Sequence, residues 1–204
     1  MKAIKLKPEI FKQFPKVRSL FVVGLLEPMI QNLRKKFLVA TMKQLHSGRP
    51  AEANEPKQYQ ADALYSKKPG IFLAVRSADC LPVLFFNPKA RVIGVVHAGW
   101  KGTAKRILQK TVRAIVKKYH TSPKDFYFFL GPAARVCCYE FANGKYFLDF
   151  VSVNKDQLSE LGVPSGHIED SGICTIHNNK YPSHRRQGQK RHSTILSLIC
   201  VMLN

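Results

Sequence analysis

Six short stretches of the chain are apolar, rich in β-branched and aromatic residues, and no longer than a typical β-strand. Each stretch is bounded by charged residues, glycine or proline, which is typical of strands separated by turns. The pattern predicts strands at residues 20–25, 37–42, 71–75, 83–86, 92–96 and 126–130. The apolar tail at residues 193–203 predicts one further strand.

One segment instead has the period of an amphipathic helix. From about Thr103 to Tyr119, apolar residues recur at helical spacing, and lysine and arginine fill the opposite face. Weaker patterns predict helices near residues 145–152 and 154–161. Strands that follow one another along the chain, with few helices between them, indicate an α+β fold in which helices pack outside the sheets.

Length and composition indicate a single domain. The chain has 204 residues, 45% of them hydrophobic, and contains no internal repeat and no linker rich in glycine, serine or proline. We expect one domain over residues 1–204, with an irregular start over residues 1–19, where basic side chains and two prolines gather. No apolar run approaches the roughly 20 residues that span a bilayer, and no secretory signal is evident. We therefore expect a cytoplasmic protein with no membrane partner.

The chain is strongly basic. It has 33 lysine and arginine residues against 13 aspartate and glutamate residues, which gives a formal net charge of +20. Such a charge favours nucleic acid, an anionic membrane or a phosphorylated small molecule as partner. Because the basic residues are spread through every segment, nucleic acid is an open but not a favoured partner.

Three residues suited to metal binding lie at the ends of predicted strands, where a rigid scaffold can hold reactive side chains. They are His46, Cys80 and His97. Two imidazoles and a thiolate around one ion leave a fourth position open for water, as in a catalytic zinc site. Their separations of 34 and 17 residues match no short zinc-finger spacing. The alternative is that Cys80 is a small buried apolar residue and that both histidines are ordinary loop or core residues.

Two basic segments are candidates for binding an anion. Lys101-Gly102-Thr103 stands at the start of the predicted helix, where free backbone N–H groups and a lysine favour phosphate. Arg185 and Arg186 lie in a basic run over residues 183–192 and could clamp a phosphate or a carboxylate. The alternatives are that Thr103 only caps the helix and that the arginine run is a solvated loop.

The cysteines indicate reduced thiols rather than a disulfide framework. There are five of them, an odd number, at positions 80, 137, 138, 174 and 200. The chain is large enough to fold without disulfide bonds. Because adjacent side chains project in different directions, we predict that Cys137 and Cys138 do not bind one ion together. The Cys-x-x-Cys pair of the zinc deaminases is missing, as are the Walker A, G-x-G-x-x-G and G-x-S-x-G motifs.

Five motifs follow one another along the chain. They are Ala61-Asp62-Ala63-Leu64, Ser77-Ala78-Asp79-Cys80-Leu81-Pro82-Val83-Leu84, His97-Ala98-Gly99-Trp100-Lys101-Gly102-Thr103, Gly131-Pro132-Ala133 with Cys137-Cys138-Tyr139-Glu140, and His184-Arg185-Arg186-Gln187-Gly188. In this order they resemble the YfiH family, also called the polyphenol-oxidase or laccase-domain family, over roughly residues 36–200. The resemblance implies a layered α/β/β/α sandwich with mixed sheets and a zinc ion held by His46, Cys80 and His97.

The resemblance also implies enzymes of purine nucleosides. The implied reactions are phosphorolysis of adenosine, inosine, guanosine and methylthioadenosine, and deamination of adenosine. For deamination, a zinc-activated water would attack the base and Asp79 would carry protons. For phosphorolysis, Lys101, the helix start at Gly102 and Thr103, and Arg185 or Arg186 would hold the phosphate. Laccase chemistry is disfavoured, because a multicopper site needs many histidines and the chain has seven, with no His-x-His pair.

Two alternatives stay open. Cys80 could be the nucleophile of a metal-free amidase with His97 as its base, a role that excludes binding a metal. The chain could also be a non-enzymatic, nucleic-acid-binding member of the family, since it departs from the usual pattern at several places. The departures are Lys101, Arg135, Val136, His184 and Gln187, where arginine, glycine, proline, tyrosine and aspartate are usual. The preferred nucleoside and the oligomeric state are left open.

Overall fold

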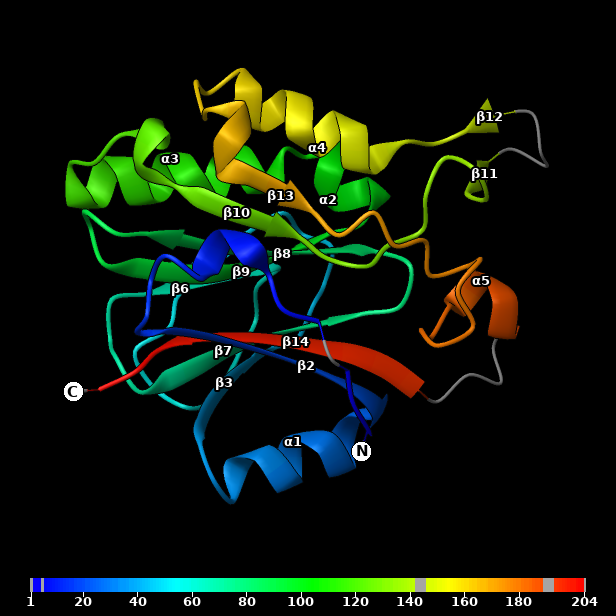
Figure 1. The fold of residues 1–204 in the computed structure, drawn as a ribbon, viewed down its shortest axis with the longest axis horizontal. Coiled ribbons are helices and arrows are strands. Elements are labelled where there is room, and N and C mark those ends of the chain that lie inside the picture. Colours follow the sequence, from blue (N-terminus) through cyan, green and yellow to red (C-terminus); the bar gives the residue numbers. More distant parts are fainter. Residues whose placement is uncertain (1, 5, 142–145, 189–192, 204) are drawn as a thin grey trace.

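Two mixed sheets lie face to face in the computed structural model, which describes residues 2–4, 6–141, 146–188 and 193–203 (Figure 1). Within this described part, one six-stranded sheet has the order β1-β2-β14-β7-β3-β5. Its strands are β1 (Lys2–Ala3), β2 (Val17–Leu25), β14 (Ser193–Val201), β7 (Ile71–Ser77), β3 (Leu38–Met42) and β5 (Gln58–Tyr59). The other six-stranded sheet has the order β13-β10-β8-β9-β6-β4. Its strands are β13 (Ile168–Asp170), β10 (Tyr127–Leu130), β8 (Leu81–Asn87), β9 (Val92–Ala98), β6 (Ala63–Ser66) and β4 (Pro50–Glu52).

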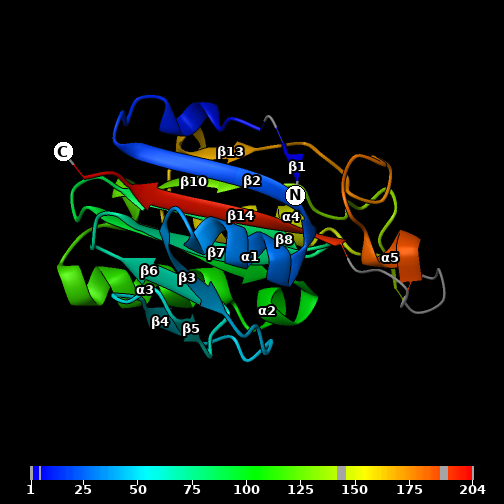
Figure 2. The same cartoon turned by 90° about the horizontal axis from the view of Figure 1, so that it is seen from below.

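Helices cover the outer face of each sheet. On the second sheet lie α2 (Trp100–Ala104), α3 (Ile107–Tyr119) and α4 (Phe150–Ser159), and α1 (Leu26–Arg34) lies on the first (Figures 1 and 2). This arrangement confirms the predicted α+β class and the α/β/β/α sandwich. Among the described residues, none of the helices could span a lipid bilayer. A short pair, β11 (Glu140–Phe141) and β12 (Tyr146–Phe147), and the short helix α5 (His184–Gln187) lie at one end of the sandwich.

Three apolar layers hold the sandwich together. Between the sheets, Phe21 of β2 packs edge-on against Phe129 of β10, with ring centroids 5.7 Å apart. Outside the second sheet, the apolar face of α3 packs on β8, β9 and β10, and outside the first sheet Met29 and Leu33 of α1 are buried. Every residue of β8 and β9 is buried, because both faces of their sheet are covered. This is why these strands are continuous apolar runs in the sequence.

The structure confirms the predicted strands but corrects the predicted helices. The helix expected from about Thr103 to Tyr119 is broken into α2 and α3, because Arg106 takes a left-handed backbone conformation with φ 57°. The Arg106 guanidinium donates hydrogen bonds to the side chains of Gln109 (2.8 Å) and Glu160 (2.7 Å), which hold this break. The two helices expected at 145–152 and 154–161 are the single helix α4, and the start of the first, Lys145, lies outside the described residues.

Residues 1–19, expected to be irregular, contain β1, the 3-10 helix η1 (Glu9–Phe11) and the start of β2 in their described part. Phe11 is buried. The Phe14 ring contacts Phe86 and Tyr127, with centroids 5.0 and 4.9 Å away. The segment is therefore packed against both sheets, since it links β2 to strands β8 and β10.

Candidate functional site

The start of β8 and the end of β9 bring a thiol and an imidazole together at one edge of the second sheet. The two strands are antiparallel, with Pro82 opposite His97. Cys80, two residues before Pro82, therefore stands beside Gly99. A Cβ atom on Gly99 would lie 2.6 Å from the Cys80 sulfur, so only glycine leaves room for the thiol next to His97.

A loop held by Asp62 carries the third residue, His46. The Asp62 carboxylate accepts hydrogen bonds from the His46 N–H (2.8 Å), the Ser47 hydroxyl (2.7 Å) and the Gly48 N–H (2.9 Å). These bonds hold the His46 backbone in a left-handed conformation with φ 55°. The buried Asp62 also accepts a hydrogen bond from the His97 N–H through its carbonyl (2.8 Å). One residue thus positions both histidines.

His46, Cys80 and His97 converge, as the sequence predicted. Their ligand atoms all lie within 4.8 Å of one another, and the two imidazole centroids are 5.0 Å apart. The Nδ1 atom of His97 is buried and has no hydrogen-bond partner in the part of the chain that the structure describes. A buried polar atom without a partner is costly, and bonding to a cation would satisfy it. The donor set therefore fits a metal ion with one position left open.

Burial sets the protonation of this group. It lowers the pKa of His97 to about 4, helped by the neighbouring His46. Burial also raises the pKa of the Cys80 thiol to about 11, and the Asp79 carboxylate adds to this effect. At neutral pH the metal-free protein thus holds a neutral imidazole, ready to bind a metal, and a neutral thiol that loses its proton on metal binding. An activated cysteine nucleophile has instead a lowered thiol pKa beside a histidine.

We expect the metal-free protein to lose stability in mild acid because of His97. Its pKa is about 4 in the folded state against about 6.5 in an unfolded chain, so between these values only the unfolded state takes up the proton. The free energy of unfolding should therefore fall by ~3 kcal/mol as the pH falls from 6.5 to 4. Urea unfolding in the presence of a chelator, at several pH values, measures this loss. Over the same pH range the variant His97→Asn should lose less stability by about that amount, and equal losses in both proteins would contradict the prediction.

The three residues line a cavity of about 340 Å³ whose wall also carries cationic side chains. Arg76, His184 and Arg185 contribute to this wall, together with Tyr139. The Arg185 guanidinium lies 4.9 Å from the centroid of the Tyr139 ring and donates a hydrogen bond to the Glu140 carbonyl (2.7 Å). The cavity therefore combines metal donors with arginines suited to an anionic ligand.

Arg76 and Gln44 also line the cavity, although no sequence motif had indicated them. The Gln44 amide donates to the Arg76 carbonyl (2.9 Å) and accepts from the Arg76 N–H (3.0 Å), and so joins the His46 loop to β7. Arg76 is the one exposed residue in a strand that is otherwise buried. A single charge inside an apolar strand is the signal that could have found it.

Asp79, predicted to carry protons, has both carboxylate oxygens engaged. One accepts a hydrogen bond from the Thr175 hydroxyl (2.7 Å) and the other from the Arg185 N–H (2.8 Å). Asp79 is buried, and its backbone has a φ of 86° directly before Cys80. In this structure its side chain joins the Cys80 turn to the segment that carries Arg185.

The predicted anion residues at the start of the helix lie elsewhere. Lys101, Gly102 and Thr103 do not belong to the described lining of the cavity. The Lys101 ammonium lies 5.5 Å from the centroid of the Trp100 ring. Thr103 is buried and its hydroxyl accepts a hydrogen bond from the Asn154 amide (2.8 Å). This hydroxyl therefore helps to join α2 to α4.

The two predicted arginines have different positions. Arg185 lines the cavity, whereas Arg186 is absent from its described lining and donates hydrogen bonds to the carbonyls of Thr175, Ile176 and Tyr181 (2.6–2.7 Å). Arg186 thus stabilises the chain between β13 and α5. The last four residues of the basic run, 189–192, lie outside the described residues.

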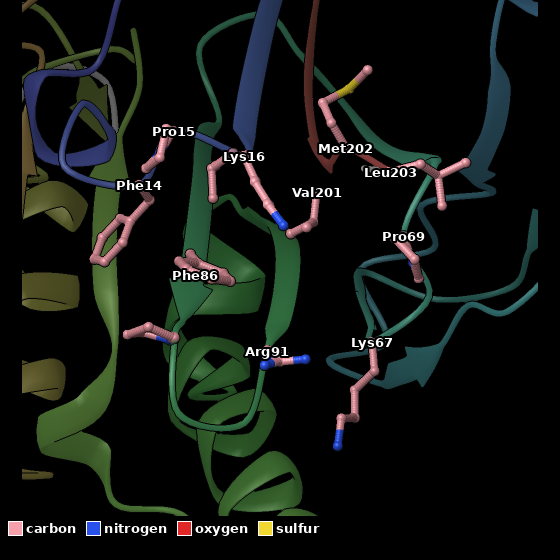
Figure 3. A pocket seen from close by; sticks show the side chains of 12 residues that line it. Phe14, Pro15, Lys16, Lys67, Pro69, Phe86, Arg91, Val201, Met202 and Leu203 are labelled. Carbon is pink, nitrogen blue, oxygen red and sulfur yellow. The ribbon is translucent and has the colours of Figure 1, made fainter.

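A larger cavity, of about 660 Å³, lies near the end of β14 (Figure 3). Phe14, Phe86, Met202 and Leu203 give it an apolar lining, and Arg91 is among its few charged residues. Its described lining contains no histidine, cysteine, aspartate or glutamate. The cavity with His46, Cys80 and His97 is therefore the candidate site.

The chain is similar in sequence to known proteins of one family. A sequence model of the family described as "Multi-copper polyphenol oxidoreductase laccase" matches residues 27–144 and 141–202. The chain is 33% identical over 153 residues to a protein of Bacteroides thetaiotaomicron named purine nucleoside phosphorylase, covering 63% of this chain and 57% of that protein. It is 36% identical over 149 residues to purine nucleoside phosphorylase YlmD of Geobacillus stearothermophilus, covering 61% and 54%. The chain thus spans little more than half the length of these two relatives.

A further relative is matched over more of its length. A protein of Clostridium acetobutylicum, also named purine nucleoside phosphorylase, is 30% identical over 182 residues, which cover 78% of this chain and 77% of that protein.

Solved structures share the fold. The crystal structure of a hypothetical protein YfiH of Bacillus licheniformis has a TM-score of 0.82 and 26% identity, covering 93% of this chain and 94% of that chain. The crystal structure of YlmD of Geobacillus stearothermophilus has a TM-score of 0.84 at 24% identity, covering 94% of both chains. The sandwich described above is therefore the fold of these proteins too.

Proposed function

The chain belongs to the YfiH family, described as multi-copper polyphenol oxidoreductase laccase, and on this premise we propose that it is a zinc-dependent purine nucleoside phosphorylase. Relatives of this chain carry the name purine nucleoside phosphorylase. The single observation that carries the proposal is the convergence of His46, Cys80 and His97 in a cavity whose wall also holds arginine. Such a cavity suits a metal and an anionic co-substrate together.

The proposed reaction exchanges one bond at the sugar for another. The glycosidic bond between the purine nitrogen and C1′ breaks, its electron pair stays with the purine, and the purine takes up the proton that hydrogen phosphate gives up. A phosphate oxygen bonds to C1′, which gives the free base and a ribose 1-phosphate. The sugar carries positive charge in the transition state, so groups that hold phosphate beside it lower the barrier.

The residues of the cavity have distinct parts in this proposal. Arg185 and Arg76 would hold the phosphate, and the hydrogen bond from the Arg185 N–H to Asp79 would fix the backbone of the phosphate-binding segment. His46, Cys80 and His97 would hold the zinc ion, which supplies Lewis acidity at the open position. Asp79 is a positioning residue here, because both its oxygens already accept hydrogen bonds.

The other candidate chemistries have less support. Adenosine deamination needs a free proton carrier, and Asp79 is engaged with Thr175 and Arg185. A cysteine amidase needs a reactive thiolate, whereas burial and the Asp79 carboxylate raise the pKa of Cys80 to about 11. A multicopper oxidase needs more histidines than one His2Cys group provides. Of these reactions, phosphorolysis is the one that needs no group beyond those present in the cavity.

Product identity tests the proposal. Zinc-loaded protein without an affinity tag is incubated with adenosine, with and without phosphate, and the products are separated by chromatography. We expect adenine and ribose 1-phosphate, formed only when phosphate is present. Inosine formed without phosphate would assign the site to deamination instead. No turnover of adenosine, inosine or guanosine under any condition would overturn the enzyme proposal, and binding of DNA that weakens steeply with salt would then support the nucleic-acid alternative.

A variant of the phosphate-binding arginine tests its role within this reaction. We expect Arg185→Ala to raise the KM for phosphate about tenfold or more, because it removes a charged contact, and to change the KM for the nucleoside much less. The control is Arg113→Ala, which removes an exposed arginine on α3 that is not part of the described cavity lining. Equal effects of the two variants would exclude Arg185 from phosphate binding.

A further inference from the structure

Three thiols and one imidazole gather where the segment after β10 meets the segment after β13. They belong to Cys137, Cys138, Cys174 and His177, whose ligand atoms all lie within 4.8 Å of one another. The sequence prediction that the thiols of Cys137 and Cys138 point apart is wrong, since their sulfurs are 3.3 Å apart. The turn after Arg135 folds both side chains toward the same point, because the N–H groups of Cys138 and Tyr139 both bond to the Arg135 carbonyl.

Two distances within this cluster match the edges of a zinc coordination tetrahedron, and the 3.3 Å between the sulfurs of Cys137 and Cys138 is shorter than such an edge. With Zn–S bonds of about 2.3 Å and Zn–N bonds of about 2.0–2.1 Å, tetrahedral geometry gives S···S edges of about 3.8 Å and S···N edges of about 3.5 Å. The Cys137 sulfur lies 3.8 Å from the Cys174 sulfur and 3.6 Å from Nδ1 of His177. We infer that Cys137, Cys138, Cys174 and His177 form a second metal site, a closed Cys3His zinc centre distinct from the His46, Cys80 and His97 group.

The donor sets of the two groups imply different roles. Four protein ligands fill a tetrahedral zinc ion and leave no position for substrate, which is typical of structural zinc. The group of His46, Cys80 and His97 supplies three ligands and leaves one position open. The second centre is therefore structural, and its assignment does not depend on the proposed phosphorolysis.

The crowding of sulfur atoms favours a cation at the cluster. The Cys137 sulfur lies 3.3 Å from the Cys138 sulfur and 3.8 Å from the Cys174 sulfur. A divalent cation removes the repulsion between thiolates held this close together.

A disulfide explains the cluster less well. Adjacent Cα atoms are about 3.8 Å apart, which is shorter than the 4.4–6.8 Å usual for a disulfide, so bonding Cys137 to Cys138 would strain the backbone. A disulfide from Cys137 to Cys174 would leave Cys138 and His177 without a role. A metal ion engages all four side chains at once.

The second centre would tie together two walls of the cavity. Cys138 is followed by Tyr139, which lines the cavity, and Cys174 is followed by Thr175, whose hydroxyl bonds to Asp79 (2.7 Å). Cys174 also pairs with Ala133 in an isolated β-bridge. An ion at this cluster therefore positions both Tyr139 and the Asp79 contact, although none of its ligands lines the cavity.

Metal counting on single and double variants tests the second centre. Protein without an affinity tag is reduced, dialysed with zinc and then freed of unbound zinc, and its metal content is measured by elemental analysis. We expect about two zinc ions per chain in the wild type, about one in Cys80→Ala, about one in Cys174→Ser and none in the double variant. Asn179→Ala, an exposed neighbour of the cluster that offers no metal ligand, should keep two.

Cobalt spectra identify the ligands without any activity assay. When Co²⁺ replaces zinc, it gives a sulfur-to-cobalt absorbance band that grows with the number of thiolate ligands. Cys80→Ala should therefore keep the stronger band, from the three thiolates of the second centre. Cys174→Ser should keep the weaker band, from the single thiolate of Cys80. The exposed Cys137→Ser and His177→Gln serve if Cys174→Ser does not fold. The second centre would be overturned if the wild type bound one zinc ion and the Cys80→Ala variant bound none. It would also be overturned if protein purified without reductant contained a disulfide between Cys137 and Cys174 that persisted after zinc was added. Because no nucleoside is involved, failure here is distinct from failure of the proposed activity.

Discussion

Cys80→Ala is expected to remove one zinc ion per chain and to lower kcat/KM for phosphorolysis about a thousandfold, equivalent to ~4 kcal/mol of transition-state stabilisation. The reason is geometric. Cys80 supplies the only sulfur of a three-residue donor set, and the two histidines left behind provide too few ligands for tight zinc binding. Steady-state kinetics with saturating phosphate, together with metal analysis of the same sample, measure both effects.

A second thiol supplies the matched control. Cys200 is buried in β14, away from the cavity, and Cys200→Ala makes the same chemical change in the apolar layer under α1. We expect this variant to keep its zinc and its activity and to lose only about 1 kcal/mol of stability. Turnover by Cys80→Ala at the rate of Cys200→Ala would show that the His46, Cys80 and His97 group is not the reactive centre.

Asp62→Ala is expected to lower both stability and metal affinity, although Asp62 touches no metal ligand atom. Its carboxylate accepts three hydrogen bonds from the His46 loop, and the substitution leaves these donors without their partner. We expect a loss of ~3 kcal/mol in the free energy of unfolding of the metal-free protein. Because the left-handed turn at His46 is then unsupported, zinc should bind about 10–100-fold more weakly.

Asp125→Ala separates the two effects of Asp62→Ala. The Asp125 carboxylate also accepts several hydrogen bonds, including one from the Ser122 N–H (3.0 Å), but it lies away from the cavity lining. Urea unfolding should show that both variants are destabilised, whereas a chelator competition should show weaker zinc binding for Asp62→Ala only. Zinc affinity lowered equally in both would mean that Asp62 acts through general stability rather than by positioning His46.

The apolar pattern of the sequence predicts the α+β class and places His46, Cys80 and His97 at strand ends, whereas the four layers were implied by the resemblance to the YfiH family. Apart from Asn87 and His97, β8 and β9 contain no polar side chain, because they are buried on both faces, and this pattern is visible without a structure. Cys80 and His97 follow directly, because a residue's place at the end of a strand is a local property. The order of the motifs also identified the family.

The local sequence pattern did not predict turns or the contacts of single side chains. The break at Arg106 depends on contacts to Gln109 and Glu160, and Glu160 lies 54 residues further along the chain. The spacing of apolar residues along a helix does not depend on such a distant partner, so the pattern predicted one helix where there are two.

Which side chains meet depends on tertiary contacts. Asp62 holds the His46 loop, Gln44 binds the backbone of Arg76, and Cys137 lies beside Cys174, 37 residues away. Residue spacing could not predict these contacts, because each depends on how separate elements pack against one another. Hydrophobic burial sets the period of each element along the chain, but polar and metal-binding contacts form between elements, where distance in the sequence has no fixed relation to distance in the fold.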